Sequence, residues 1–296
     1  MPFENYDRVM KNIQVFGERY CKEHLDCWDT KLLQNNWWEA LDFFFGHSFM
    51  RGRRDELSNE YHYFTIEALE DYFSITKERL DSSYEELIGQ KEYFHKDSIL
   101  NFKKEKNIGR GNSIKHKDFR REISEKNPII KLLTTPRMVN IPWDDKTYKK
   151  KVFLSNDADV MMVLDCLKFI SEGRKNIYNH LRNEIATFGV KTAYIELIEI
   201  RAISDKIASL VIRDIVLINS DLIDRDYDMA FPVDTWVKKI AHKLGCNSED
   251  TKDIKNYLIN KCQEFNMNPL KIAAGLWFLG INSLDLVIEK LGKVDY

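Results

Sequence analysis

Two segments near the C-terminal end decide the fold: IEIRAISDKIASLVIRDI, residues 198–215, and FPVDTWVKKIAHKLG, residues 231–245. After Asp205 the first segment is apolar almost all round, and a helix of that kind is buried. In the second, Asp234 occupies a helix N-cap position and Gly245 stands where the helix would stop. The sequence therefore predicts two helices, with Lys206 at the start of the first and Asp234 at the cap of the second.

The composition is that of an ordinary globular protein. The chain has 296 residues, 44% hydrophobic and 31% charged, which allows one large or two medium domains. It contains neither an apolar run long enough to cross a bilayer nor the features of a signal peptide. The five cysteines are scattered and odd in number, which predicts free thiols rather than a disulfide framework. We expect a cytoplasmic protein, associated with the nucleoid if its source is prokaryotic.

Helical periodicity dominates the chain. Apolar side chains recur at helical spacing within residues 37–45 and again within residues 160–170, where Ser155 or Asn156 would be the cap. Strand-like alternation is scarce, so we expect an all-α protein. Three prolines at positions 128, 136 and 142 and the sequence NIPWDD, residues 140–145, predict a turn-rich link. The loosest part of the chain is therefore expected between residues 101 and 151.

Basic residues cluster in three places. Residues 103–121 hold eight Lys or Arg against two acids and, with Gly109 and Gly111, are interpreted as a mobile basic loop. The other clusters are Lys149 to Lys151 and the group Arg51, Arg53 and Arg54. The formal charge of −2 does not by itself indicate a nucleic-acid binder, so such binding depends on these clusters. Each could equally be a solvated surface.

The C-terminal pattern resembles the helix-hairpin-helix (HhH-GPD) DNA glycosylases, whose hairpin lysine precedes a proline-valine-aspartate turn. The match falls on Lys206 and on Pro232, Val233 and Asp234. The 28-residue interval from Lys206 to Asp234 is longer than in the endonuclease III branch and looks more like the archaeal 8-oxoguanine DNA glycosylase branch. No tight cysteine cluster follows Gly245, which argues against the iron-sulfur cluster of the endonuclease III branch.

The similarity to the family is specific over roughly residues 155–282. A fainter match to the 8-oxoguanine branch is SFMRGRRDELSNEYHYFTIEALEDYF, residues 48–73. Many family members carry two hairpin glycines that let backbone amides approach a DNA phosphate. Here those places hold Ala202 and Ser204. This departure puts phosphate binding by the hairpin backbone in doubt.

The resemblance implies a base-excision-repair DNA glycosylase with AP lyase activity that removes an oxidised purine such as 8-oxoguanine from double-stranded DNA. The Lys206 amine would attack the sugar C1′, expel the base and hold the sugar as a Schiff base. Partial burial at the start of an apolar helix would favour the neutral amine. The Asp234 carboxylate would stabilise positive charge developing on the sugar. As alternatives, Lys206 could be a plain exposed lysine and Asp234 a helix cap.

A flipped base needs aromatic faces and a few polar groups. The candidates for this pocket are Trp277, Trp236, Phe278, His47 and Ser48. Aromatic residues at such spacing also fit a hydrophobic core. The candidates for DNA contact are Ser204, Lys238 and Lys239, and the two lysines could equally face solvent.

No metal-ligand pattern or phosphate-binding glycine loop occurs, so we expect no metal, no cofactor and a monomer. The expected architecture is a two-lobed helical bundle with a helix-hairpin-helix element and a basic cleft between the lobes. Residues 1–127 would form an N-terminal helical region with the basic loop near 101–127, and residues 128–296 the glycosylase-like region. One lobe would centre on the hairpin helices, and the other would combine the N-terminal helices with those after Gly245. Two further functions remain open: a non-catalytic helix-hairpin-helix DNA-binding protein and a glycosylase without lyase activity.

Overall fold

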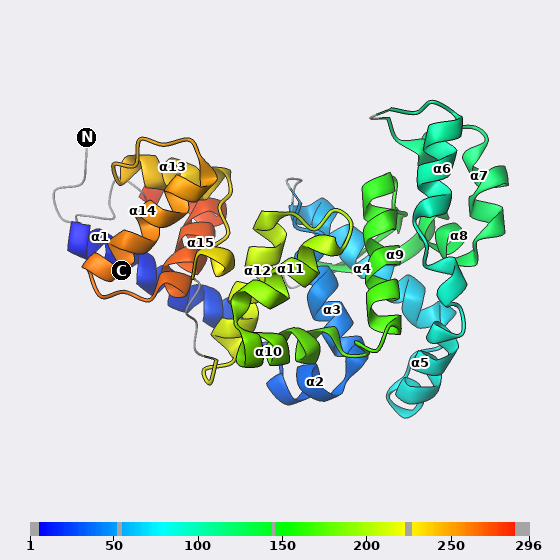
Figure 1. Ribbon diagram of the computed structural model, residues 1–296, viewed down its shortest axis with the longest axis horizontal. Coiled ribbons are helices and arrows are strands. Elements are labelled where there is room, and N and C mark those ends of the chain that lie inside the picture. The colour runs from blue at the N-terminus through cyan, green and yellow to red at the C-terminus, as the bar shows by residue number, and fades with distance from the viewer. Residues whose placement is uncertain (1–5, 52–54, 110, 144–145, 223–226, 288–296) are drawn as a thin grey trace. The chain divides into compact units, whose positions relative to one another are not determined.

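The computed structural model describes residues 6–51, 55–109, 111–143, 146–222 and 227–287 (Figure 1). Within these ranges the chain forms the helices α1 to α15, short 3-10 and π segments and one two-stranded sheet. The predicted all-α fold class is thus confirmed. None of the described helices combines the length and the apolar character that a membrane crossing requires. The five cysteines are free, as predicted.

The chain divides into two compact units. Unit 1 comprises Met1–Lys31, Leu181–Leu197 and Ser204–Tyr296, and unit 2 comprises Leu32–His180 and Ile198–Ile203. This division differs from the expected boundary at residue 127, because unit 1 is assembled from three separate stretches of chain. The hairpin helices also share a unit with both the N-terminal helix and the helices after Gly245, whereas we expected them in different lobes.

Unit 1 is held together by helices from both ends of the sequence. Its elements are α1 (Tyr6–Tyr20), the π-helix η1 (Cys21–Leu25), α12 (Asp205–Ile218), the 3-10 turn η6 (Tyr227–Ala230), α13 (Thr235–Lys243), α14 (Thr251–Glu264) and α15 (Pro269–Val287). Three helices contribute residues to both units: α2 (Thr30–Asn35), α10 (Ile177–Phe188) and α11 (Val190–Glu199).

The closest packing in unit 1 joins α1 to α15, the blue and red helices of Figure 1. A Cβ atom on Gly17 would lie 2.0 Å from the carbonyl oxygen of Lys271, and one on Gly275 would lie 2.0 Å from that of Ile13. Glycine is therefore needed on both helices for the two backbones to touch. Their apolar faces form one core with side chains of α13 and α14, including Ile240.

Unit 2 contains α-helices of 4 to 18 residues. Its α-helices are α3 (Trp37–Ser48), α4 (Asp55–Tyr72), α5 (Leu80–Ile88), α6 (Asp97–Glu105), α7 (Phe119–Glu122), α8 (Pro128–Thr134) and α9 (Asp157–Ser171). Its 3-10 turns are η2 (Lys77–Arg79), η3 (Lys91–Tyr93), η4 (Ser113–Lys115) and η5 (Ser124–Lys126). Asn156, one of the two predicted caps, is the N-cap of α9, and its side chain accepts a hydrogen bond from Ala158 N–H. Arg51 and Asp159 form an ion pair inside this unit.

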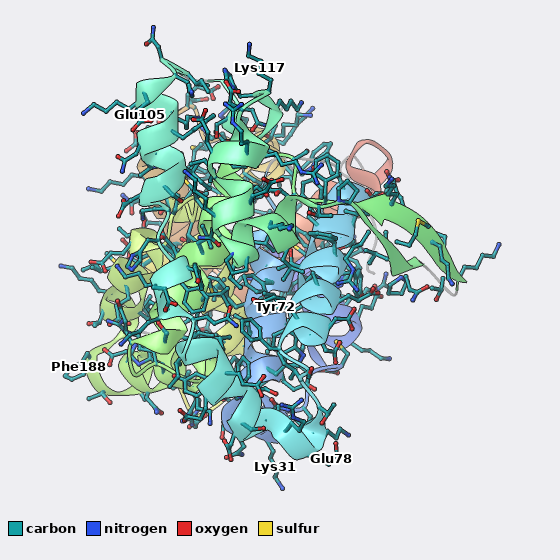
Figure 2. All side chains as sticks on the ribbon, turned by 90° about the vertical axis from the view of Figure 1, so that its right-hand side faces the viewer. Lys31, Tyr72, Glu78, Glu105, Lys117 and Phe188 are labelled. Carbon is teal, nitrogen blue, oxygen red and sulfur yellow. The ribbon has the colours of Figure 1, made fainter. Side chains whose placement is uncertain are left out.

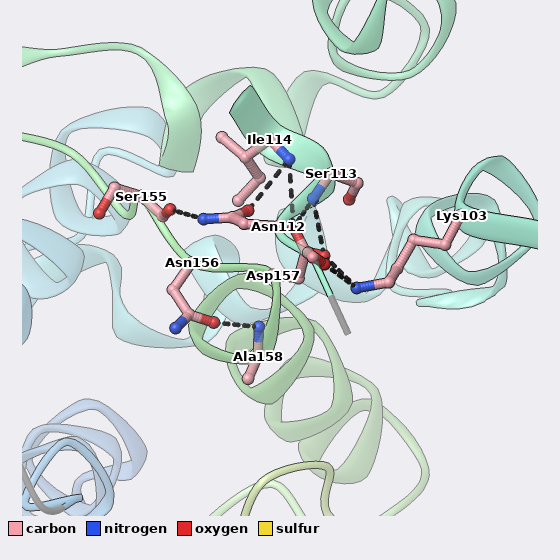
Figure 3. Close-up of polar contacts among 9 residues, drawn as sticks. Lys103, Asn112, Ser113, Ile114, Ser155, Asn156, Asp157 and Ala158 are labelled. Carbon is pink, nitrogen blue, oxygen red and sulfur yellow. Dashed lines mark hydrogen bonds and ion pairs between the residues drawn. The ribbon is translucent and has the colours of Figure 1, made fainter. Parts of the chain in front are cut away.

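The basic segment after α6 is folded rather than loose. Asp157, at the start of α9, accepts hydrogen bonds from Lys103 Nζ at 2.7 Å, Ser113 N–H at 2.9 Å and Ile114 N–H at 3.1 Å (Figure 3). Burial would raise the pKa of Asp157, but these donors outweigh it and lower the pKa. The predicted mobile loop is wrong for the described residues, because a buried carboxylate collects the backbone amides and a lysine of the segment. Arg110 lies outside the described residues, as do Arg53 and Arg54.

A β-hairpin follows α8 where a turn-rich link was expected. Strands β1 (Arg137–Trp143) and β2 (Lys146–Val152) are antiparallel, with Arg137 opposite Val152 and Trp143 opposite Lys146. β1 packs against α4, and Figure 2 shows the two green strands extending beyond that light-blue helix. The expected turn at residues 140–145 is confirmed only in that the chain reverses between β1 and β2. Asp144 and Asp145 lie outside the described residues.

Candidate active site

The hairpin turn joins α11 to α12 without glycine. Ala202 has a φ of 65°, in the left-handed region that favours glycine, and Ile203 N–H donates to the Ile200 carbonyl at 3.1 Å. The backbone therefore adopts the conformation for which glycine would be the usual choice. Ser204 follows as the N-cap residue of α12, exposed and without a side-chain capping bond.

Lys206 lies in the first turn of α12, where it is half-buried, and the helix beyond it is buried along most of its length. The preceding residue, Asp205, accepts hydrogen bonds from Tyr194 Oη at 2.8 Å and from Lys255 Nζ at 3.0 Å. These bonds join the start of α12 to α11 and α14. The N-terminal end of α12 is thereby held by side chains from two neighbouring helices.

Asp234 caps α13 as predicted. Its Oδ1 accepts hydrogen bonds from the backbone N–H groups of Trp236 and Val237, both at 2.9 Å. The carboxylate is half-buried, and Phe231, Pro232 and Val233 before it are buried. The predicted helix stop is also confirmed, because α13 ends at Lys243 and Gly245 has a φ of 96°. The side chain is thus held in a fixed position at the helix N-terminus.

The connection between Lys206 and Asp234 returns to the helix that carries the lysine. η6, which ends four residues before Asp234, packs against α12. Asp228 and Met229 of η6 line a pocket of 470 Å³ together with Asp205, the residue before Lys206. η6 therefore lies beside the N-terminal end of α12. Lys206 and Asp234 belong to the same compact unit, although neither lines this pocket.

The pocket beside the start of α12 is lined mainly by polar and charged residues. Besides Asp205, Asp228 and Met229, it is lined by Tyr194, Asp250, Thr251, Lys252, Lys255 and Asn256. Burial raises the pKa of Tyr194 to about 12, and its hydrogen bond to Asp205 and the charge of Asp228 act in the same direction. The phenol is therefore protonated at neutral pH and donates to Asp205.

Trp277 and Phe278 belong to an aromatic cluster at the end of α1. The Trp277 ring meets the Tyr20 and His24 rings edge-on, with centroids 5.4 Å and 6.0 Å apart. Phe278 lies 6.0 Å from the His24 ring and 6.3 Å from the Phe16 ring. Phe278 is buried, whereas Trp277 is half-buried and His24 is exposed on the π-helix η1. Single-turn π segments are frequent at functional sites.

A buried charged pair from α12 adjoins this cluster. Tyr20 Oη donates to Asp214 Oδ2 at 2.5 Å, Arg213 Nε donates to Asp214 Oδ1 at 2.7 Å, and the guanidinium carbon lies 4.6 Å from the Tyr20 ring centroid. Arg213 and Asp214 have no exposed surface. Arg213 Nη1 and Nη2 are buried and have no hydrogen-bond acceptor among the described residues. Burial raises the pKa of Tyr20 and lowers that of His24.

Sequence reasoning missed this group of Tyr20, His24, Arg213 and Asp214. A signal was present, because Arg213 and Asp214 interrupt the apolar run of α12, and fully buried charges are rare unless they are paired. The contribution of Tyr20 and His24 could not be read from the sequence, since they reach the site only through the packing of α1 against α15.

The other predicted residues have mainly structural contacts. Trp236 packs so closely on α15 that a Cβ atom on Gly280 would lie 2.4 Å from the Trp236 Cβ. Lys239 Nζ lies 4.4 Å from the Trp236 ring centroid, and Lys238 Nζ donates to the Glu249 carbonyl at 2.9 Å. Neither lysine contact prevents a role in DNA binding, which stays a prediction.

His47 and Ser48 belong to unit 2, whereas all the other candidate residues belong to unit 1. Both are buried in α3. His47 Nδ1 lies 2.7 Å from the Phe43 carbonyl oxygen, and Ser48 Oγ donates to the Phe44 carbonyl at 2.7 Å. These bonds within one helix explain both polar side chains without a ligand.

Comparisons with family models, curated proteins and solved structures gave no match. Across the described residues there is also no group of three or more His, Cys, Asp or Glu side chains that could hold a metal ion. The site is therefore interpreted from its own geometry.

Proposed function

We propose that the chain is a base-excision-repair DNA glycosylase with AP lyase activity that acts on an oxidised purine such as 8-oxoguanine. The observation that carries this proposal is the placement of Lys206 and Asp234 in one compact unit. Both are half-buried, each stands at the start of a helix, and η6 returns the connecting chain to the start of α12. An amine and a carboxylate held in this way suit attack at C1′ and stabilisation of a cationic sugar.

In the proposed reaction the Lys206 amine attacks C1′ as the bond from C1′ to the base nitrogen breaks. The departing base takes the bonding electrons and the proton that the attacking amine loses, and Asp234 offsets the positive charge on the sugar. The sugar ring opens to a Schiff base on Lys206 Nζ. Removal of a C2′ proton then expels the 3′ phosphate, and water releases the lysine.

The aromatic cluster supports an oxidised purine as the substrate. Trp277 offers a half-buried ring for stacking, and Arg213 has two buried NH2 groups, Nη1 and Nη2, for which no described residue provides an acceptor. Buried donors without acceptors are costly and call for an explanation. The carbonyl oxygens of 8-oxoguanine are acceptors of the kind that a guanidinium binds, and in the proposed complex the packing of Tyr20 over the fully buried Arg213 opens to admit them.

Borohydride trapping tests the proposal. Wild-type protein incubated with a duplex containing 8-oxoguanine should give a covalent adduct, and Lys206→Gln should give none. Lys191→Gln is a matched control, because Lys191 is an exposed lysine in the first turn of α11 in the same unit. Adduct formation by Lys206→Gln would refute the role of this lysine. Base release without an adduct would indicate a monofunctional glycosylase, and DNA binding without base release a non-catalytic binding protein.

A further inference from the structure

The β-hairpin of unit 2 has two chemically different faces. By strand alternation and register, Val139, Ile141 and Val152 point inward and are buried. The opposite face, here called the outer face, carries residues that are all exposed: Met138, Asn140, Pro142, Thr147, Lys149 and Lys151. A two-stranded ribbon therefore leaves a complete face uncovered within unit 2.

The cations on the two faces of the hairpin differ in their ion pairs. On the inner face Arg137 pairs with Asp71, and Lys150 pairs with Glu60 at 2.5 Å. On the outer face Lys149 and Lys151 have no ion-pair partner among the described residues. Among the described residues of that face none is acidic, and Asp144 and Asp145 of the connecting turn lie outside the described ranges. Arg137 and Lys150 of the inner face thus bind carboxylates of α4, whereas Lys149 and Lys151 of the outer face bind none that is described.

The spacing of the outer lysines suits a nucleic-acid backbone. Lys149 and Lys151 are two residues apart on one strand, a separation of about 6.7 Å. Successive phosphates rise about 3.4 Å along each strand of a duplex, so the separation of the two lysines corresponds to a rise of two phosphates. The major groove of B-DNA admits a two-stranded β-ribbon. Met138, with 58% of its surface exposed, lies directly opposite Lys151, so the face also presents one large apolar side chain beside its charges.

We propose that the outer face of the hairpin binds the phosphate backbone of double-stranded DNA through Lys149 and Lys151. The choice of duplex DNA rests on the proposed function, whereas the need for an anionic partner rests on the uncompensated lysines. A-form RNA fits this ribbon less well because its major groove is deep and narrow. A membrane surface fits less well because the face offers a single large apolar side chain.

Binding to an undamaged duplex, measured by fluorescence anisotropy over a range of salt concentrations, tests this without requiring catalysis. Each phosphate contact contributes about 0.9 to the slope of log affinity against log salt and a factor of about 8 at 0.1 M salt. The double variant Lys149→Gln/Lys151→Gln should therefore lower the slope by about 1.8 and weaken binding about 60-fold at 0.1 M salt. Thr147→Lys, which adds a cation to the same face, should raise the slope by about 0.9.

The matched control is Lys77→Gln/Lys91→Gln, which removes two exposed lysines from 3-10 turns of the same unit. It should leave slope and affinity unchanged. Equal slopes for wild type and the Lys149/Lys151 double variant, with both folded by circular dichroism, would overturn the proposal. So would a loss confined to single-stranded RNA or to phosphatidylserine vesicles.

The proposed catalysis and the proposed DNA contact of the hairpin can be refuted independently. If wild-type protein binds duplex DNA with the expected slope change but gives no borohydride adduct, the hairpin inference holds and the proposed catalysis fails. If an adduct forms and the slope is insensitive to Lys149 and Lys151, the hairpin inference alone falls. If wild-type protein does not bind duplex DNA, both are overturned.

Discussion

Replacement of Asp234 by Asn separates its capping role from its charge. In the structure a single oxygen, Oδ1, accepts the N–H groups of Trp236 and Val237. The side-chain carbonyl of Asn can accept the same two bonds with the same geometry. The substitution therefore preserves the cap and removes only the negative charge at the helix N-terminus.

The effect on stability should be small. Asn and Asp are about equally favourable as N-caps, so only the interaction of the carboxylate with the helix dipole is lost, about 0.3–1 kcal/mol. Asp234→Ala removes the cap as well and should cost about 0.5–2 kcal/mol. The effect on catalysis should be much larger, because a preorganised charge at a reacting centre contributes on the order of 100-fold or more in rate.

The assay is single-turnover release of 8-oxoguanine from a duplex, paired with urea unfolding of each variant. Asp250→Asn is the matched control, since Asp250 caps α14 in the same unit by accepting from Lys252 and Asp253 N–H at 2.8 and 3.1 Å. Asp234→Asn should unfold like Asp250→Asn and release base far more slowly. Wild-type rates of release by Asp234→Asn would refute the reasoning and leave capping as the only role of this residue.

Two further predictions concern the framework. Asp157→Asn should lower the free energy of unfolding by about 1.5–3 kcal/mol, because the Asn carbonyl still accepts from Ser113 and Ile114 N–H, which both donate to Oδ1, whereas Lys103 loses its charged acceptor Oδ2. The pKa of Asp157 is lowered in the folded state, so its contribution is present above the unfolded pKa of about 3.9 and lost as pH falls through the folded pKa. Urea unfolding at several pH values should show an acid-side loss that is smaller in the variant, and parallel curves would contradict this account. Ala202→Gly should stabilise the hairpin turn by roughly 0.5–1 kcal/mol, since relief of the left-handed strain exceeds the entropy cost of glycine; a lower urea midpoint would disprove it.

The local features of the site could be predicted from the sequence. Asp234 as a cap, Gly245 as a stop and the buried character of α12 all depend on residues within one or two helical turns of each other. Such signals are local, so one sequence is sufficient to read them. The same holds for Asn156 as the cap of α9.

The hairpin could not be predicted by the same reasoning. β2 reads KTYKKKV, and its buried face within the strand is supplied mainly by Val152, so no alternation of apolar and polar residues marks it as a strand. The strand is fixed instead by pairing with β1 and by the ion pair from Lys150 to Glu60, 90 residues away in the chain. The distribution of residues between the two units likewise depends on α1 meeting α15, a contact between opposite ends of the sequence.

The buried pair Arg213 and Asp214 gives a local signal in the sequence, whereas its contact with Tyr20 depends on the fold. Desolvation makes a buried ion pair a poor source of stability, and apolar residues of similar volume would often do as well. Here the guanidinium also leaves two buried nitrogens without acceptors, a further cost to the fold. Departures from good packing are expected where a site requires them. The pair lies on the same helix as Lys206 and contacts Tyr20, whose ring in turn meets that of Trp277, so the fold holds a costly charged pair between the helix of the proposed nucleophile and the aromatic cluster.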